Sequence, residues 1–218
     1  MDSRQKATGA LFVAFPRASV FKGNIFILTQ PPYSMLEEPR AFNVLITGTP
    51  GTGKTSLSQM VSAELGLTHL DTGAIVKSQK FYTDFDEQYG SFMVDEEDEE
   101  HLLDYLEPIL VEGGKVLDYH SCELFPKRWF HAVIVLRVDT QPHFDRLTAR
   151  GYGEAKREEN MDAEIEGVVA EEAADSYDED VLHVVSHNTL DDMCAAVELV
   201  RRLKAEFDTR SSRAAAAA

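Results

Sequence analysis

Along residues 40–208, short apolar runs alternate with segments in which hydrophobic residues recur at helical spacing. Five short runs, most of them apolar and rich in β-branched side chains, predict buried strands. These runs cover residues 42–47, 68–71, 116–118, 132–138 and 181–185. Between them, apolar side chains recur at helical spacing. Strands that alternate with helices predict an α/β fold with a central parallel five-stranded sheet flanked by helices.

The predicted helices carry recognisable terminal signals. The helix that begins at Thr55 should end before Gly66, since glycine is a frequent C-terminal cap. Another helix should begin in the run of six acids at 95–100, which complements a helix dipole, and should end at Gly113. Further helices are predicted over residues 73–82, 142–150, 162–177 and 189–207.

Residues 48–55 read Gly-Thr-Pro-Gly-Thr-Gly-Lys-Thr, a complete G-x-x-x-x-G-K-[ST] phosphate-binding loop. A predicted strand precedes this loop and a predicted helix follows it, as the motif requires, which disfavours a chance match by a glycine-rich turn. The glycines let successive N–H groups approach a phosphate. Lys54 adds positive charge over the β- and γ-phosphates, and the Thr55 hydroxyl can ligate Mg²⁺. The loop predicts binding of a nucleoside triphosphate.

The composition limits the partners that we expect. The net charge of −17 repels nucleic acid, so we expect no direct sequence-specific nucleic-acid binding, and a basic protein partner is favoured. The alternative is that the acidity only confers solubility. No apolar stretch reaches the roughly 18 residues of a membrane span. Two cysteines, Cys122 and Cys194, are too few for a disulfide framework and fit a reducing intracellular compartment.

The ends of the chain differ from its middle. Residues 1–40 contain few acids and interleave phenylalanines with small residues, which predicts a poorly ordered extension or, alternatively, an organelle transit segment. Residues 41–208 suit one P-loop kinase domain. The tail 209–218 ends in five alanines and is predicted to be disordered.

Two candidate catalytic residues lie at the end of the third predicted strand and just beyond it. Asp118 follows an apolar run, where an acid that supports Mg²⁺ is expected, although a surface aspartate is the alternative. His120 lies two residues further on. It could handle a proton or position water, or it could be structural.

A second candidate lies at the end of the helix predicted over 142–150. Arg150 precedes Gly151 and Gly153, which predict a hinge, and an arginine at the base of a mobile lid can neutralise a transferring phosphoryl group. Lys156 could instead be a surface cation. Arg137 is expected to point toward the site from its buried strand.

Two classes of P-loop protein, GTPases and large ATPases, do not fit this chain. A GTPase needs an N-K-x-D guanine reader, which this chain lacks, and a large ATPase needs more chain. Small P-loop kinases fit the length, because positioning and charge stabilisation supply most of the catalysis of phosphoryl transfer.

Several strings together resemble the adenylate kinase isoenzyme 6 family. They are the loop at 48–55, Glu-Gly-Gly at 112–114, Val-Leu-Asp-Tyr-His at 116–120, Phe-Pro-Lys-Arg-Trp-Phe-His at 125–131 and Thr-Ala-Arg-Gly-Tyr at 148–152. The resemblance covers roughly residues 42–207. Members are also known as coilin-interacting nuclear ATPases and as small-subunit ribosome assembly factors. Ordinary adenylate kinases carry D-G-x-P-R after the equivalent strand, which this chain lacks.

The resemblance implies a P-loop nucleoside-monophosphate kinase fold with a short lid. It implies transfer of a phosphoryl group from ATP to AMP with Mg²⁺, and a slower ATPase activity. Residues expected to bind ATP are Gly51, Gly53, Lys54, Thr55, Ser56, Arg150 and Thr189, the last through its backbone. Asp118 and His120 would form the Walker B-like motif, with Thr55 and Asp118 at the metal.

The resemblance also implies an acceptor segment and partners. A monophosphate would bind along residues 71–94, with Thr72 and Gly73 at the start and Lys77 as a further contact. The expected partners are a basic small-subunit ribosomal protein and pre-ribosomal particles, in the nucleus and cytoplasm. The alternative to a kinase is an ATP-switched assembly factor or chaperone with little kinase flux.

Overall fold

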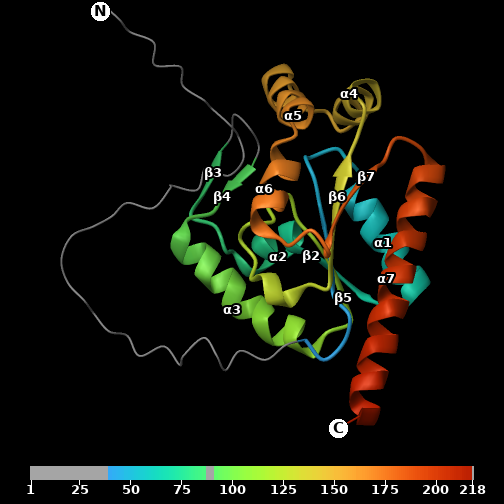
Figure 1. Cartoon of the computed structure of the whole chain (residues 1–218). Coiled ribbons are helices and arrows are strands. Elements are labelled where there is room, and N and C mark those ends of the chain that lie inside the picture. The colour runs from blue at the N-terminus through green and yellow to red at the C-terminus, as the bar shows by residue number, and fades with distance from the viewer. Residues whose placement is uncertain (1–38, 87–90, 218) are drawn as a thin grey trace, which may run out of the picture.

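A five-stranded sheet forms the centre of the protein (Figure 1), in a computed structural model that describes residues 39–86 and 91–217. The strands are β1 (Val44–Thr47), β2 (Thr68–Asp71), β5 (Lys115–Asp118), β6 (Ala132–Arg137) and β7 (Leu182–Ser186). Their order across the sheet is β2-β5-β1-β6-β7. Every neighbouring pair is parallel, which confirms the predicted fold class.

Helices cover both faces of this sheet (Figure 1). The covering helices are α1 (Lys54–Leu65) and α7 (Leu190–Ala217) on one face and α3 (Glu96–Glu112) and α6 (Val168–Ser176) on the other. Each face therefore has its own hydrophobic core. Leu45 of β1 packs in one core and its neighbours Val44 and Ile46 pack in the other, as the alternation of side chains along a strand requires.

The remaining elements lie around the carboxyl ends of the strands (Figure 1). They are α2 (Thr72–Gln79), the antiparallel hairpin of β3 (Asp84–Asp86) and β4 (Ser91–Met93), α4 (Thr140–Ala149) and α5 (Glu154–Glu166). The sequence did not predict the hairpin, because its strands have only three residues each and β3 places an acid on either side of its one phenylalanine. A 3₁₀ helix over Lys127–Trp129 precedes β6.

Two predicted segments differ in the structure. The helix predicted over 162–177 is instead two helices, α5 and α6, which meet at Gly167. Gly167 has φ 79°, and a Cβ there would lie 2.9 Å from Nη1 of Arg137, so only glycine suits this break. At the other end, α7 continues to Ala217, through residues predicted to be a disordered tail, because alanine is the best helix former. The predicted extension at 1–40 lies, except for its last two residues, outside the described residues.

The acidic run begins α3, as predicted. Asp95 is the N-cap: its Oδ1 accepts hydrogen bonds from the N–H groups of Glu97 and Asp98, and Asp98 reaches back to the N–H of Asp95. This capping box satisfies N–H groups that have no partner within the helix, and the acids of the first turn complement the dipole. In the described part of the chain, no helix is both long and apolar enough to span a membrane.

Asn43 ties three segments together at the amino ends of the central strands. Its side chain is fully buried and donates from Nδ2 to the carbonyl oxygens of Leu110 at 2.7 Å and Trp129 at 3.0 Å. Its Oδ1 accepts from the N–H of Lys115 at 3.0 Å. One side chain therefore satisfies the end of α3, the start of β5 and the turn before β6.

We expect Asn43→Leu to lower the free energy of unfolding by about 3 kcal/mol. The change leaves the carbonyl of Trp129 and the N–H of Lys115 without partners, and it leaves the carbonyl of Leu110 with only the N–H of Gly113. Chemical denaturation monitored by circular dichroism measures this loss. As a control, Thr209→Ala removes one exposed hydrogen bond and should change stability by less than about 0.5 kcal/mol. A loss of similar size in both variants would contradict the assigned role of Asn43.

Acidic side chains from different elements also repel one another. Burial, together with the charge of Glu123, raises the pKa of Glu172 on α6 to about 7. Its Oε2 is buried and has no hydrogen-bond partner among the described residues. Burial, Glu96 and Glu123 likewise raise the pKa of Glu99 to about 7. The folded state therefore favours the protonated form of both carboxyl groups.

These shifts predict a stability that falls as pH rises. An unfolded glutamate ionises near its ordinary pKa of 4.5, whereas folded Glu172 ionises near 7, so its contribution is lost as pH rises across that window. We expect Glu172→Gln to raise the free energy of unfolding at pH 8 but not at pH 4.5. Denaturation at both pH values measures it, with exposed Glu171→Gln as control. Equal effects of Glu172→Gln at both pH values would contradict the assignment.

Candidate active site

A cavity of about 470 Å³ opens at the carboxyl ends of β1, β2 and β5. Residues of the phosphate-binding loop line one part of it, and α2, the β3–β4 hairpin and α5 line the rest. Predicted site residues that line the cavity are Gly51, Gly53, Lys54, Thr55, Gly73, Asp118, His120 and Arg150. Parallel strands place their carboxyl ends at one edge of the sheet, which is why distant segments of the chain meet here.

The phosphate-binding loop links β1 to α1. Gly51 and Gly53 have φ of 97° and 99°, a region that favours glycine. Lys54 folds back over the loop, and its Nζ donates to the carbonyl oxygens of Gly48 at 2.6 Å and Thr49 at 3.1 Å. Burial lowers the pKa of Lys54 to about 8, and nearby Asp118 opposes this shift. A bound anion would favour the charged form of Lys54 further.

Asp118 ends β5 and is held by a residue that the sequence reasoning missed. His69 of β2 donates from Nε2 to Oδ2 of Asp118 at 2.8 Å. Burial raises the pKa of Asp118, and the hydrogen bond from His69 opposes that rise. The register pairs Asp71 with Asp118, so His69, two residues earlier, shares their face of the sheet. Alternation along 68–71 was the signal that could have found His69.

His120 lines the cavity beyond Asp118 and packs against Tyr119, with 4.3 Å between ring centroids. Burial, and then the charge of Lys54, lower the pKa of His120 to about 3. The imidazole is therefore neutral near pH 7. A neutral imidazole can accept a hydrogen bond from water and donate another, which suits the orientation of a water molecule.

The segment after α4 supplies further cations. Arg150 caps α4 and lines the cavity, and Gly151 with φ 75° turns the chain toward α5. Lys156 also lines the cavity, with Nζ 4.5 Å from the centre of the Tyr152 ring. Two cations therefore reach the cavity from this segment.

Four predicted contact residues lie elsewhere in this structure. Ser56 and Lys77 are exposed and do not line the cavity, and Thr72 is buried. Thr189 is exposed; its N–H donates to Oδ2 of Asp192 at 2.8 Å, which caps α7. Their contacts with a nucleotide stay predictions.

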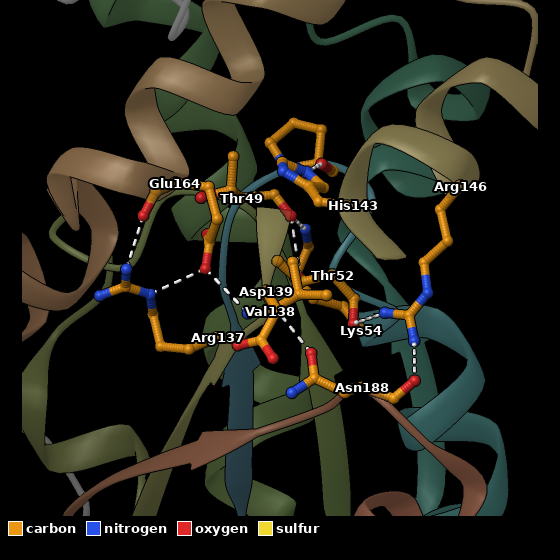
Figure 2. Close-up of polar contacts among 11 residues, drawn as sticks. Thr49, Thr52, Lys54, Arg137, Val138, Asp139, His143, Arg146, Glu164 and Asn188 are labelled. Carbon is orange, nitrogen blue, oxygen red and sulfur yellow. Dashed lines mark hydrogen bonds and ion pairs between the residues drawn. The ribbon is translucent and has the colours of Figure 1, made fainter. Parts of the chain in front are cut away.

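Arg137 does not point into the cavity, so that expectation was wrong. Its Nε donates to Oε1 of Glu164 at 2.8 Å, and its Nη2 donates to the carbonyl of Glu164 (Figure 2). Glu164 also accepts from the N–H of Val138 at 2.9 Å, so α5 is fixed to the end of β6. Arg137 is an anchor for α5 because Glu164 faces β6 there, a contact between distant segments that the sequence pattern does not show.

Arg146 connects α4 to the loop from outside the cavity. Its Nη1 donates to the carbonyl of Thr52 at 3.3 Å, and its Nη2 donates to that of Asn188 at 3.0 Å (Figure 2). The side chain of Asn188 in turn accepts from the N–H of Asp139 at 2.8 Å. The phosphate-binding loop, α4 and the turn before α7 are therefore joined.

Comparison with known proteins agrees with this geometry. Residues 44–167 match a family described as an AAA domain. The chain is 43% identical over 173 residues to an adenylate kinase isoenzyme 6 homolog of Caenorhabditis elegans, covering 78% of this chain and 93% of that protein. The homolog of Drosophila melanogaster is 40% identical over 159 residues, covering 73% and 89% of the two chains.

A solved structure shares the fold. Shikimate kinase from Acinetobacter baumannii, in complex with shikimate, superposes with a TM-score of 0.53 and 16% identity over 77% of this chain and 95% of that chain. The coverage of the curated relatives, the loop and the parallel sheet lead to one assignment. The chain belongs to the adenylate kinase isoenzyme 6 family and is a nucleotide-binding phosphotransferase of the P-loop kinase fold.

Proposed function

We propose that the protein transfers the γ-phosphoryl group of ATP to AMP and forms two molecules of ADP. The observation that carries this proposal is a single cavity that contains the phosphate-binding loop and extends beyond it to α2, the hairpin and α5. A kinase needs such an arrangement, because donor and acceptor must meet in line with water kept out.

The part of the cavity away from the loop suits a nucleoside monophosphate. Its walls are largely apolar or aromatic, and they are formed by Val76, Phe92, Met93, Val94 and Tyr152. Such walls fit a nucleobase, while Arg150 and Lys156 offer positive charge to a phosphate. Gly73 lines the same region at the start of α2 and presents no side chain to an acceptor.

The residues at the loop fit Mg²⁺ held together with a nucleotide. The Thr55 hydroxyl and the Asp118 carboxylate line the same cavity, and Mg²⁺ prefers a few protein oxygens combined with phosphates and water. Among the described residues, no cluster of His, Cys, Asp or Glu could hold a metal alone. Mg²⁺ would neutralise charge on the phosphate oxygens. His69 orients Asp118 for this role through its hydrogen bond.

The chain's own cations would stabilise the transferring group. Lys54 lies at the loop and Arg150 at the base of the segment that leads to α5, so both can face a phosphoryl group between donor and acceptor. Fixed charges in a site that excludes water stabilise the negative charge that moves during transfer.

We expect purified protein to form ADP from ATP, AMP and Mg²⁺, and the ADP that depends on AMP should amount to two molecules for each AMP consumed. Separation of nucleotides by ion exchange measures all three species. Lys54→Met should lower the rate at least about 100-fold, because it removes a charge that contacts the phosphates. Absence of AMP-dependent ADP formation by a protein that still binds ATP would contradict the proposal.

A second function is favoured by His120 at the loop end of the cavity. A neutral imidazole beside Lys54 can position water for attack on ATP, so we propose an additional ATPase activity. In this proposal, ATP hydrolysis changes the affinity of the protein for a basic small-subunit ribosomal protein within pre-ribosomal particles, in the nucleus and cytoplasm. The net charge of −17 and the acidic start of α3 support a basic partner.

We expect His120→Gly to lower ATP hydrolysis at least about tenfold, while ATP affinity changes less than about threefold, because His120 would act on water rather than on ATP binding. Phosphate release measures hydrolysis and calorimetry measures affinity. Equal losses in both quantities would show that His120 is structural.

A further inference from the structure

Two histidines contact the side of the phosphate-binding loop that faces away from the cavity. His143 of α4 donates from Nε2 to the carbonyl oxygen of Pro50 at 2.8 Å (Figure 2). His187, in the turn between β7 and α7, donates from Nδ1 to the carbonyl oxygen of Thr52 at 2.5 Å. A carbonyl only accepts hydrogen bonds, so the proton lies on Nε2 of His143 and on Nδ1 of His187.

Because each peptide unit is rigid, these hydrogen bonds also fix N–H groups on the other side of the loop. A trans peptide unit is planar, and its C=O and N–H groups point in opposite directions. The carbonyl of Pro50 shares a peptide unit with the N–H of Gly51, and that of Thr52 shares one with the N–H of Gly53. Each histidine that holds a carbonyl outward therefore holds a glycine N–H toward the cavity, which both glycines line.

Both peptide units precede a glycine of the loop that has a positive φ, and they can rotate unless a hydrogen bond holds them. Gly51 and Gly53 both adopt positive φ, and a peptide unit that precedes glycine can rotate because no Cβ opposes it. The imidazoles also pack directly behind the glycines. A Cβ at Gly51 would lie 3.0 Å from ring atoms of His143, and a Cβ at Gly53 would overlap the ring of His187.

Stability alone does not explain His187. His187 is 3% exposed, and its Nε2 is buried with no hydrogen-bond partner among the described residues. A buried polar atom without a partner destabilises the folded state, and an apolar residue would avoid this cost. The hydrogen bond to Thr52 is what the imidazole provides that an apolar side chain does not.

We propose that His143 and His187 are positioning residues of the ATP site. They keep the N–H groups of Gly51 and Gly53 directed at the phosphates of ATP, and they act through the loop without touching the nucleotide. This inference rests on the ATP site of the proposed function but not on its acceptor, so it can be tested with ATP alone.

Paired variants separate the hydrogen bond from the packing of the ring. His143→Leu removes the histidine donor to Pro50. His187→Leu removes the shorter of the two hydrogen bonds to the carbonyl of Thr52 and leaves the one from Arg146 at 3.3 Å. His143→Gln and His187→Asn keep an N–H close to the position of the original nitrogen. We expect each leucine variant to bind MgATP about tenfold more weakly, and the amide variants to stay within about threefold of wild type. Calorimetric titration measures the dissociation constants, and thermal unfolding confirms that each variant folds.

The amide resonances of the two glycines report on each tether separately. We expect ATP to shift the ¹H–¹⁵N signals of both Gly51 and Gly53 in the wild-type protein. His143→Leu should reduce the shift of Gly51 and spare that of Gly53, and His187→Leu should do the reverse. A general structural role would reduce both shifts in each variant.

A third histidine provides the control. Nδ1 of His131 accepts from the N–H of Asn43 at 3.0 Å, at the opposite ends of the strands. His131→Leu should lower stability and leave ATP affinity unchanged.

Three results would overturn the inference: leucine variants that bind ATP within twofold of wild type, amide variants as weak as the leucine ones, or loss of both glycine shifts together in a folded variant. Absence of ATP binding by wild-type protein would overturn both this inference and the proposed function. Absence of AMP phosphorylation alone would contradict only the proposed function.

Discussion

Each N–H group that the phosphate-binding loop turns toward an anion leaves a carbonyl that points the other way, into the protein. Those carbonyls must find donors there, because a buried acceptor without one destabilises the fold. In this chain His143, Arg146 and His187 provide them, from α4 and the turn before α7. The shape of the phosphate site therefore depends on elements that meet the loop from outside, and those elements are placed by the sheet.

The two ends of the sheet carry different kinds of polar contact. At the amino ends, Asn43 satisfies backbone groups from α3, β5 and the turn before β6. At the carboxyl ends, buried polar side chains are oriented for chemistry, as His69 orients Asp118. The segment between α4 and α5 extends the site, and the pair of Arg137 and Glu164 fixes α5 to β6. Contacts that stabilise the fold therefore lie at the amino ends of the strands, and residues expected to bind ligands lie at the carboxyl ends.

The sequence predicted those features of the fold that depend on residues close together in the chain. The structure confirms the loop at 48–55, the five strands, the cap at Gly66 and the helix that begins in the acidic run at 95–100, and each of these depends on neighbouring residues. The hairpin is local, but its three-residue strands are too short to give a pattern. The break at Gly167 and the roles of three histidines depend on contacts between segments far apart in the sequence; these histidines are His69, His143 and His187. The sequence around a single histidine does not indicate its partner. The position of Arg137 on a buried strand likewise does not indicate that its side chain pairs with Glu164.

The proposed reaction requires that one cavity hold a triphosphate at the loop and a monophosphate beside it. A crystal structure with a non-hydrolysable ATP analogue, Mg²⁺ and AMP tests this directly. We expect the analogue's phosphates on the N–H groups of Gly51 and Gly53, with AMP enclosed by α2, the hairpin and α5. AMP bound outside this cavity, or absent from a crystal that contains the analogue, would contradict it.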